Sequence, residues 1–154
     1  MKTMNLTTAI KKSIDRSVLC WLATVSEEGM PNVSPKEVFT YYGTDSIIIA
    51  NIASPQTVKN IKTNTNVCVS FIDVLVQKGY QLKGKAAIII ASDPDFESMY
   101  AVLTKMTGGK FPFQTITQIS LGQVKPIIAP RYRFYPETTE EAQIASAKKA
   151  YGIS

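Results

Sequence analysis

Histidine is absent from this chain of 154 residues. Its absence excludes the Ser-His-Asp triad, histidine general bases and most zinc sites, all of which depend on the imidazole ring. Any catalysis must therefore use lysine, tyrosine or carboxylate groups, or a cofactor that carries its own chemistry. We expect no metal site, and the sequence assigns no residue a catalytic role.

The chain also has little cysteine and no long apolar run. Cys20 and Cys68 each lie in an apolar, strand-like run and form no Cys-x-x-Cys pair, which favours core thiols over redox or metal groups. No apolar run approaches the roughly 20 residues that a membrane-spanning helix needs. Met1 to Ser17 is polar and helix-like, without the apolar core of a signal peptide. We therefore expect a cytoplasmic protein with no membrane partner.

The composition predicts a single globular domain over residues 1–154, since 45% of the residues are hydrophobic and 19% are charged. The net charge of +5 suits an anionic ligand. Nucleic acid is not the expected partner, because the basic residues are scattered and the aromatic residues are not interleaved with them. A local anion site is favoured over a basic face.

The apolar periodicity predicts a mainly β (α+β) protein. The residues form strand-like runs at 18–25, 33–42, 46–53, 66–73, 80–91, 115–121 and 124–135. The first of these runs is continuously apolar, which predicts a strand buried on both faces. Gly84 in the middle of a run predicts a bulge or a close backbone approach.

Short helices are expected between and around these strands. They are predicted at residues 6–16, after Ser54-Pro55, from Asp93-Pro94 to Gly108-Gly109, and at 139–150 behind the capping box Thr138-x-x-Glu141. The first three strands have no helix between them, which argues against a parallel doubly wound sheet. We therefore predict a six-stranded antiparallel β-barrel over residues 17–135 with peripheral helices.

Two segments carry the candidate site. Leu22 to Lys36 holds Pro31 and Pro35, which predict an edge strand because proline cannot donate to a neighbouring strand. A helix that begins after Ser54-Pro55 offers free N–H groups and the positive end of its dipole to an anion. Thr57 and Asn60 share one face of that helix, whereas Lys59 points away from them and is interpreted as a solvated lysine.

Three pieces of sequence then resemble a known family. They are A-T-V-S-E-E-G-M-P-N-V-S-P-K, I-I-I-A-N-I-A-S-P-Q-T-V-K-N-I-K-T-N and G-Y-Q-L-K-G-K-A. In this order they resemble the FMN-binding split barrels related to pyridoxamine 5′-phosphate oxidase, over residues 8–135. The resemblance implies a homodimer of six-stranded split barrels with two FMN sites between the subunits. It also implies an electron donor and acceptor, small molecule or protein, that the sequence does not identify.

The resemblance implies a position for each part of the cofactor. Residues that would line the ring and ribityl chain are Pro35, Lys36, Glu37 and Val38, bordered by Ala50 and Asn51. Residues that would hold the phosphate are Gln56, Thr57 and Asn60. Lys36 beside the ring would stabilise the reduced, anionic flavin, so Lys36→Met is expected to lower the midpoint potential.

The sequence departs from the family in two ways. The basic residues typical of the oxidase phosphate site are replaced by Gln56 and Thr57, and the Arg-x-His pair that holds pyridoxal phosphate cannot exist without histidine. Arg131-Tyr132-Arg133 lies nearby but is not that motif. We therefore expect an FMN-binding flavoprotein, an oxidoreductase or electron carrier, that does not oxidise pyridoxamine phosphate.

Other interpretations of the same residues stay open. Within the fold, the ligand could be a deazaflavin, making the protein a deazaflavin-dependent reductase, or haem, although haem normally takes an axial histidine. A ligand-free barrel with an interaction or stress role is a different class of function. Locally, Lys36 could be a solvated edge residue, and Thr57 and Asn60 could serve only as hydrogen-bonding residues at the start of a helix.

Overall fold

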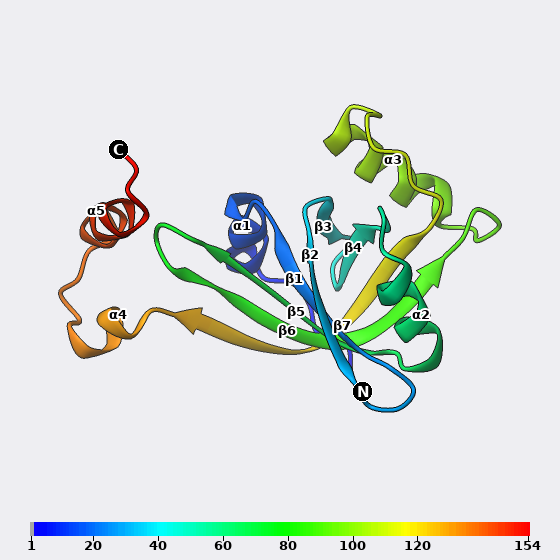
Figure 1. Ribbon diagram of the computed structural model, residues 1–154, viewed down its shortest axis with the longest axis horizontal. Coiled ribbons are helices and arrows are strands. Elements are labelled where there is room, and N and C mark those ends of the chain that lie inside the picture. The colour runs from blue at the N-terminus through cyan, green and yellow to red at the C-terminus, as the bar shows by residue number, and fades with distance from the viewer. Residues whose placement is uncertain (1) are drawn as a thin grey trace.

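A computed structural model describes residues 2–154, which fold around one curled antiparallel sheet (Figure 1). The sheet has seven strands in the order β2-β1-β5-β6-β7-β4-β3. Their bounds are β1 Cys20–Val25, β2 Pro31–Lys36, β3 Phe39–Tyr42, β4 Ser46–Ala50, β5 Asn66–Asp73, β6 Lys78–Ile89 and β7 Ile116–Ile128. The mainly β split barrel is confirmed. None of the helices within residues 2–154 is long and apolar enough to cross a membrane.

The predicted strand at 33–42 is in fact two strands, so the sheet has seven strands and not six. β2 pairs with β1 at one edge, and β3 pairs with β4 at the other. The two-residue link Glu37–Val38 carries the chain from one edge of the sheet to the other, and the Val38 carbonyl accepts a hydrogen bond from the Ala50 amide at 3.0 Å. The sheet therefore curls until its edges meet at this link, which splits the barrel.

Two strands were predicted at 115–121 and 124–135, but the structure has only one strand there. One strand, β7, runs through Gly122, and the ladder with β6 changes register where Lys83 and Gly84 lie opposite Gln123 and Leu121. The bulge expected at Gly84 is confirmed: a Cβ there would lie 2.3 Å from the carbonyl oxygen of Ser120. The bulge absorbs the extra residue, so the strand bends and does not end.

The expected exposure pattern of β1 is also corrected. β1 alternates between buried and open positions, and Trp21 is 49% exposed, so only one face of the strand is buried. β2 is an edge strand, as Pro31 and Pro35 predict, since it pairs with β1 alone. Trp21 lies opposite Pro35 and Ala23 opposite Val33, which gives the outer surface of this hairpin an apolar character.

Three helices cover the barrel. α1 (Thr8–Arg16) packs Ile10 and Ile14 into the main core, and α2 (Pro55–Thr63) begins after Ser54 as predicted. α3 (Phe96–Thr107) ends at Gly108 in the left-handed conformation, as predicted, but it begins two residues after Pro94. Asp93 accepts a hydrogen bond from the Ile90 amide at 2.7 Å and so caps the preceding turn. Met106, expected in the buried stripe of α3, is 49% exposed.

The chain ends in an arm that lies at one end of the β6–β7 ribbon, away from α2 and α3 (Figure 1). The expected strand through Tyr135 is replaced by α4 (Pro130–Phe134), because Pro130 takes the first helical position. α5 (Glu140–Tyr151) is capped by Thr139, not by Thr138: its Oγ1 accepts a hydrogen bond from the Ala142 amide at 3.1 Å.

Candidate functional site

The first turn of α2 is open to a ligand. Ser54 occupies the N-cap position, but its side chain makes no capping hydrogen bond. Its hydroxyl instead donates to the Ile52 carbonyl at 3.0 Å. Pro55 follows at the start of the helix, and the first turn holds no acidic residue. The N–H groups and the positive dipole end of α2 are therefore left without a carboxylate or hydroxyl cap, which is the arrangement that binds anions.

Lys36 brings a positive charge to the same place. It is the last residue of β2, it is only 7% exposed, and its Nζ donates to Ser54 Oγ at 2.6 Å. Among residues 2–154, no carboxylate pairs with it, since Lys78 and Glu140 form the single ion pair there. Burial lowers the pKa of the Lys36 ammonium below its usual range, and the neighbouring Cys20 partly opposes this. A buried ammonium without a counter-ion is costly, and an anionic ligand would remove that cost.

Cys20 lies directly opposite Lys36 in the β1–β2 ladder and is fully buried. Burial raises the pKa of its thiol to about 12, and the positive charge of Lys36 opposes the shift only in part. The thiol is therefore neutral at physiological pH and has the inert character of a core cysteine, as the sequence predicted. It gives Lys36 no negative partner.

The polar face of α2 is turned toward the sheet. Thr57 and Asn60 are both 2% exposed. The Thr57 hydroxyl lies 3.2 Å from that of Ser34 on β2, and the Asn60 amide donates to Thr24 Oγ1 on β1 at 2.9 Å. Gln56, which is exposed, donates to the Asn60 carbonyl oxygen at 2.8 Å. These bonds hold α2 on β1 and β2, so they fix where the first turn of the helix points.

The end of β4 forms the next part of the site. Ala50 is buried, whereas Asn51 is half-buried just beyond the strand. The Asn51 amide donates to Thr115 Oγ1 at 3.1 Å, and its carbonyl oxygen accepts from Thr117 Oγ1 at 2.8 Å. Both ends of the Asn51 side chain are thus held by residues at the start of β7 and just before it.

A groove of about 740 Å³ runs along α2. This volume is within the range of roughly 300–1,000 Å³ that is typical of small-molecule sites. Its lining joins the end of β4 and the first turn of α2 to the loop before β7, through Asn51, Ser54, Pro55, Val58, Lys59, Lys62, Pro112, Phe113, Gln114 and Thr115. The groove is therefore bordered by both the open helix start and the bonded Asn51.

The remaining predicted site residues lie around the split between β2 and β3. Pro35 and Glu37 are exposed, and the half-buried Val38 packs against the smaller core cluster. The structure thus brings Lys36, Ser54 and the start of α2 together, and it places Asn51 on the groove. Thr57 and Asn60 do not line the groove. Within residues 2–154 the Glu37 carboxylate forms no ion pair.

Sequence reasoning missed part of this lining. Lys59 is exposed, as its interpretation as a solvated lysine predicts, but it also borders the groove with Lys62, one helical turn further along the same face. Their spacing of three residues was a usable signal. The opposite wall, from Pro112 to Thr115, comes from a distant part of the chain, so no local pattern could have paired it with α2.

Comparison with known proteins agrees with this architecture. Residues 6–134 match the family model described as pyridoxamine 5′-phosphate oxidase. No curated protein gives a significant sequence match. Solved structures share the fold, among them an FMN-binding protein from Syntrophomonas wolfei subsp. wolfei, 17% identical over 78% of this chain and 84% of that chain, with a TM-score of 0.66.

Two further solved structures name other ligands. HutZ, described as the heme storage protein of Vibrio cholerae, is 17% identical over 81% of this chain and 95% of that chain, with a TM-score of 0.65. An F420 reductase is 21% identical over 78% of this chain and 98% of that chain, with a TM-score of 0.60. At these identities the likeness establishes the fold and leaves the ligand open. Because the family model spans residues 6–134, most of the chain, this protein belongs to the pyridoxamine 5′-phosphate oxidase family.

Proposed function

We propose that this protein is an FMN-binding flavoprotein that acts as an oxidoreductase or electron carrier. The observation that carries the proposal is the buried ammonium of Lys36 beside the open first turn of α2. Within residues 2–154 the Lys36 ammonium has no carboxylate partner, and the start of α2 has no side-chain cap. Both features favour the binding of an anionic group between them. The groove beside them has room for the remainder of a nucleotide-sized molecule.

The roles of the polar residues follow from their contacts. The first-turn N–H groups of α2 and the charge of Lys36 bind the phosphate, with Gln56 exposed at the same turn. Thr57 and Asn60 position the helix through Ser34 and Thr24. Bound FMN supplies hydride or one-electron chemistry, and the protein orients the ring and limits its exposure to water.

The proposed protein is a homodimer whose subunits meet through the outer face of β1 and β2. Trp21 and Val33 are 49% and 57% exposed and share this face with Pro35, through directly opposed pairs in the ladder. Aromatic and aliphatic side chains in one patch are typical of the centre of a protein interface. A second copy of the chain on this face would cover them and border the exposed Pro35 and Glu37, which the family resemblance places beside the ring.

Alternative ligands differ in what they require of this chain. A deazaflavin shares the tricyclic ring and the phosphate, and the positive charge of Lys36 suits it equally. Haem in the histidine-ligated form is disfavoured because the sequence holds no histidine. Pyridoxamine phosphate oxidation is disfavoured for the same reason, since the Arg-x-His pair cannot form.

Identification of the chromophore in the purified protein tests the proposal. We expect a yellow protein with flavin absorption bands, from which denaturation releases a compound with the mass of FMN. If the protein is purified colourless, added FMN should restore the same spectrum. Release of a deazaflavin or haem would contradict the proposal, as would a colourless protein that takes up no FMN.

A further inference from the structure

A second cavity, of about 390 Å³, lies toward the end of the β6–β7 ribbon that points away from α2 (Figure 1). It is open to solvent on one side and is bordered by α1, the β5–β6 hairpin, the end of β7 and the first turn of α5. It shares no lining residue with the groove. Part of its lining is apolar, from Val76, Ile127 and Ile128, and Lys12 and Arg16 of α1 add positive charge.

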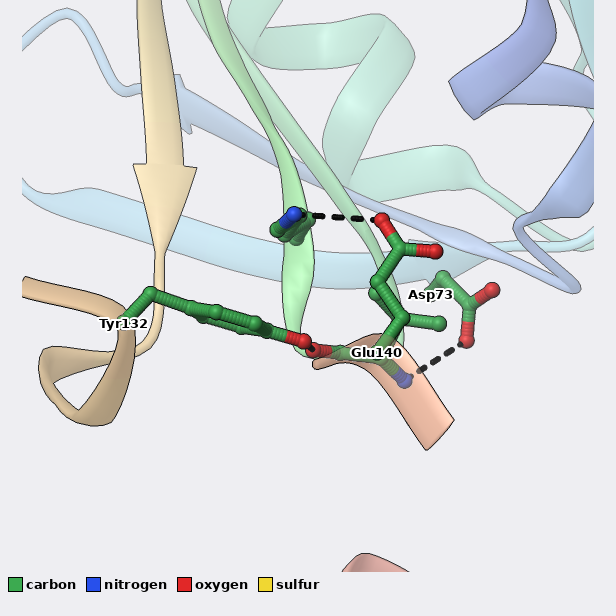
Figure 2. A network of polar contacts seen from close by, with 5 residues as sticks. Asp73, Tyr132 and Glu140 are labelled. Carbon is green, nitrogen blue, oxygen red and sulfur yellow. Dashed lines mark hydrogen bonds and ion pairs between the residues drawn. The ribbon is translucent and has the colours of Figure 1, made fainter. Parts of the chain in front are cut away.

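The two acidic residues of the cavity already have partners (Figure 2). Glu140 Oε1 accepts from Lys78 Nζ at 3.1 Å, which forms an ion pair. Asp73 Oδ1 accepts from the backbone amides of Leu75 and Val76 at 3.1 and 3.2 Å, so this carboxylate caps the hairpin turn. The negative charge in the cavity is therefore engaged with Lys78 and with the backbone.

Two of the three cations of α1, Lys12 and Arg16, border this cavity, and both are exposed. Lys12 and Arg16 are one helical turn apart and line the same cavity. Within the described part of the chain neither forms an ion pair, since Lys78 and Glu140 form the single pair there. Like charges one turn apart repel each other, and a shared anion would convert that repulsion into attraction. The cavity thus combines two unpaired cations with an apolar wall.

We propose that this cavity is a second binding site, which takes a small organic anion with an apolar body. The carboxylate of the ligand lies between Lys12 and Arg16, and its hydrocarbon part packs against Ile127 and Ile128. The volume admits a compound the size of an aromatic carboxylate, at the lower end of the range for ligand sites. The site is separate from the proposed FMN site, so it would hold a regulator or a second substrate.

Glu140 lines this site next to Lys78, its ion-pair partner. It belongs to α5, which lies outside residues 6–134 of the family match. The Lys78 ammonium also lies 4.4 Å from the centre of the Tyr132 ring, and Tyr132 donates its hydroxyl proton to the Val76 carbonyl at 2.8 Å. A ligand carboxylate would compete with Glu140 for Lys78, so binding would be coupled to the docking of α5.

Benzoate titration followed by amide NMR tests this proposal. We expect saturable shifts confined to the segments that line the cavity, residues 9–16, 73–80 and 126–128 and the first turn of α5 at Glu140, and none with benzyl alcohol, which has the same ring without the charge. The double variant Lys12→Ala, Arg16→Ala should bind benzoate about tenfold more weakly, the loss typical of removing hydrogen bonds to a charged group. Glu140→Gln should bind it more tightly, because Lys78 is then free.

The control variant Lys105→Ala, Lys110→Ala removes the same charge from the last turn of α3 and the loop that follows it, and should bind benzoate like the unmodified protein. FMN uptake should be equal in all variants, which separates this site from the proposed function. Equal benzoate affinity in the Lys12, Arg16 variant and the unmodified protein would overturn the proposal. Shifts centred on the groove beside α2 would also overturn it.

Discussion

Lys36 Nζ lies 2.6 Å from Ser54 Oγ, so a buried ammonium at the end of an edge strand is joined to the residue that precedes α2. Ser54 is the single hydrogen-bond acceptor for this ammonium within residues 2–154. The contact fixes a positive charge beside the first turn of the helix, and it accounts for an N-cap serine that does not cap.

Replacement of Ser54 by alanine should destabilise the apoprotein. The change leaves the Lys36 ammonium buried without a partner, and we expect a loss of about 1–3 kcal/mol in the free energy of unfolding. Urea denaturation measures it. Ser146→Ala, at an exposed position of α5, is the matched control and should change stability by less than about 0.5 kcal/mol. Equal stability of the two variants would show that Lys36 does not depend on Ser54.

Cys20 should make the protein less stable at alkaline pH. Its thiol has a pKa of about 12 when folded, against a usual value of 9.0, so the folded state holds its proton longer than the unfolded state. The contribution of this thiol to the free energy of unfolding is therefore fully present below pH 9.0 and is lost as the pH rises toward about 12. At 1.36 kcal/mol per pKa unit the total loss is about 4 kcal/mol.

Unfolding of Cys20→Ala at a series of pH values checks this prediction, because the variant should lose most of the alkaline decline. Cys68→Ala, which removes a half-buried thiol, should retain most of it. Lys36 contributes with the opposite sign: its lowered pKa makes stability rise as the pH approaches 10.5. Lys36→Met should therefore make the decline steeper. An unchanged slope in Cys20→Ala would contradict this account.

The Asn60–Thr24 hydrogen bond predicts coupled effects of mutation. Asn60→Leu and Thr24→Val each leave a buried polar group without its partner, and each should cost about 1–3 kcal/mol of stability. The double variant should cost less than the sum, because it leaves no unpaired group of this pair. FMN affinity should fall only slightly in Asn60→Leu, because the contact between Thr57 and Ser34 still holds α2 on β2. A large loss of FMN affinity in a stably folded Asn60→Leu protein would instead show that Asn60 binds the phosphate.

The exposed face of Trp21 predicts the mode of assembly. Trp21→Glu places a charge in the centre of the proposed interface and should convert a dimer into a monomer, measured by light scattering. Met106→Glu is the control, since Met106 is equally exposed, at 49%, on α3. FMN affinity should fall in the Trp21 variant alone. A Trp21→Glu protein that remains dimeric would place the interface on another face.

Local signals predicted much of this fold. Ser54-Pro55 indicated the start of α2, Gly108 the end of α3, and Gly84 a bulge, because each depends on backbone geometry within a few residues. The division at Glu37–Val38 was not predicted: the residues from Ser34 to Glu37 interrupt the apolar pattern, but the point at which the chain crosses from one sheet edge to the other depends on the curling of the whole sheet.

The candidate site was less accessible to sequence reasoning. Lys36 at the end of an edge strand has the pattern of a solvated residue, and its burial depends on Ser54, 18 residues further along the chain. Thr57 and Asn60 were correctly placed on one helix face, but their partners lie on β1 and β2, so the face turned toward the sheet. Such facts arise from packing between distant segments.

Lys36→Met also bears on the expectation that this lysine tunes the ring. If its charge acts at the ring, the midpoint potential of the bound flavin should fall in the variant. If it acts at the phosphate, affinity should fall with little change in potential. The contact with Ser54 favours the second outcome.

Titration of FMN into apoprotein, with the unmodified chain and Lys36→Met side by side, tests the central claim most directly. The account predicts saturable binding of a single FMN per chain, weakened in the variant by roughly 10- to 100-fold, as for a lost hydrogen bond to a charged group. Lys105→Met should bind FMN like the unmodified protein. Absence of FMN binding by the unmodified chain, or equal affinity of the Lys36→Met variant, would contradict it.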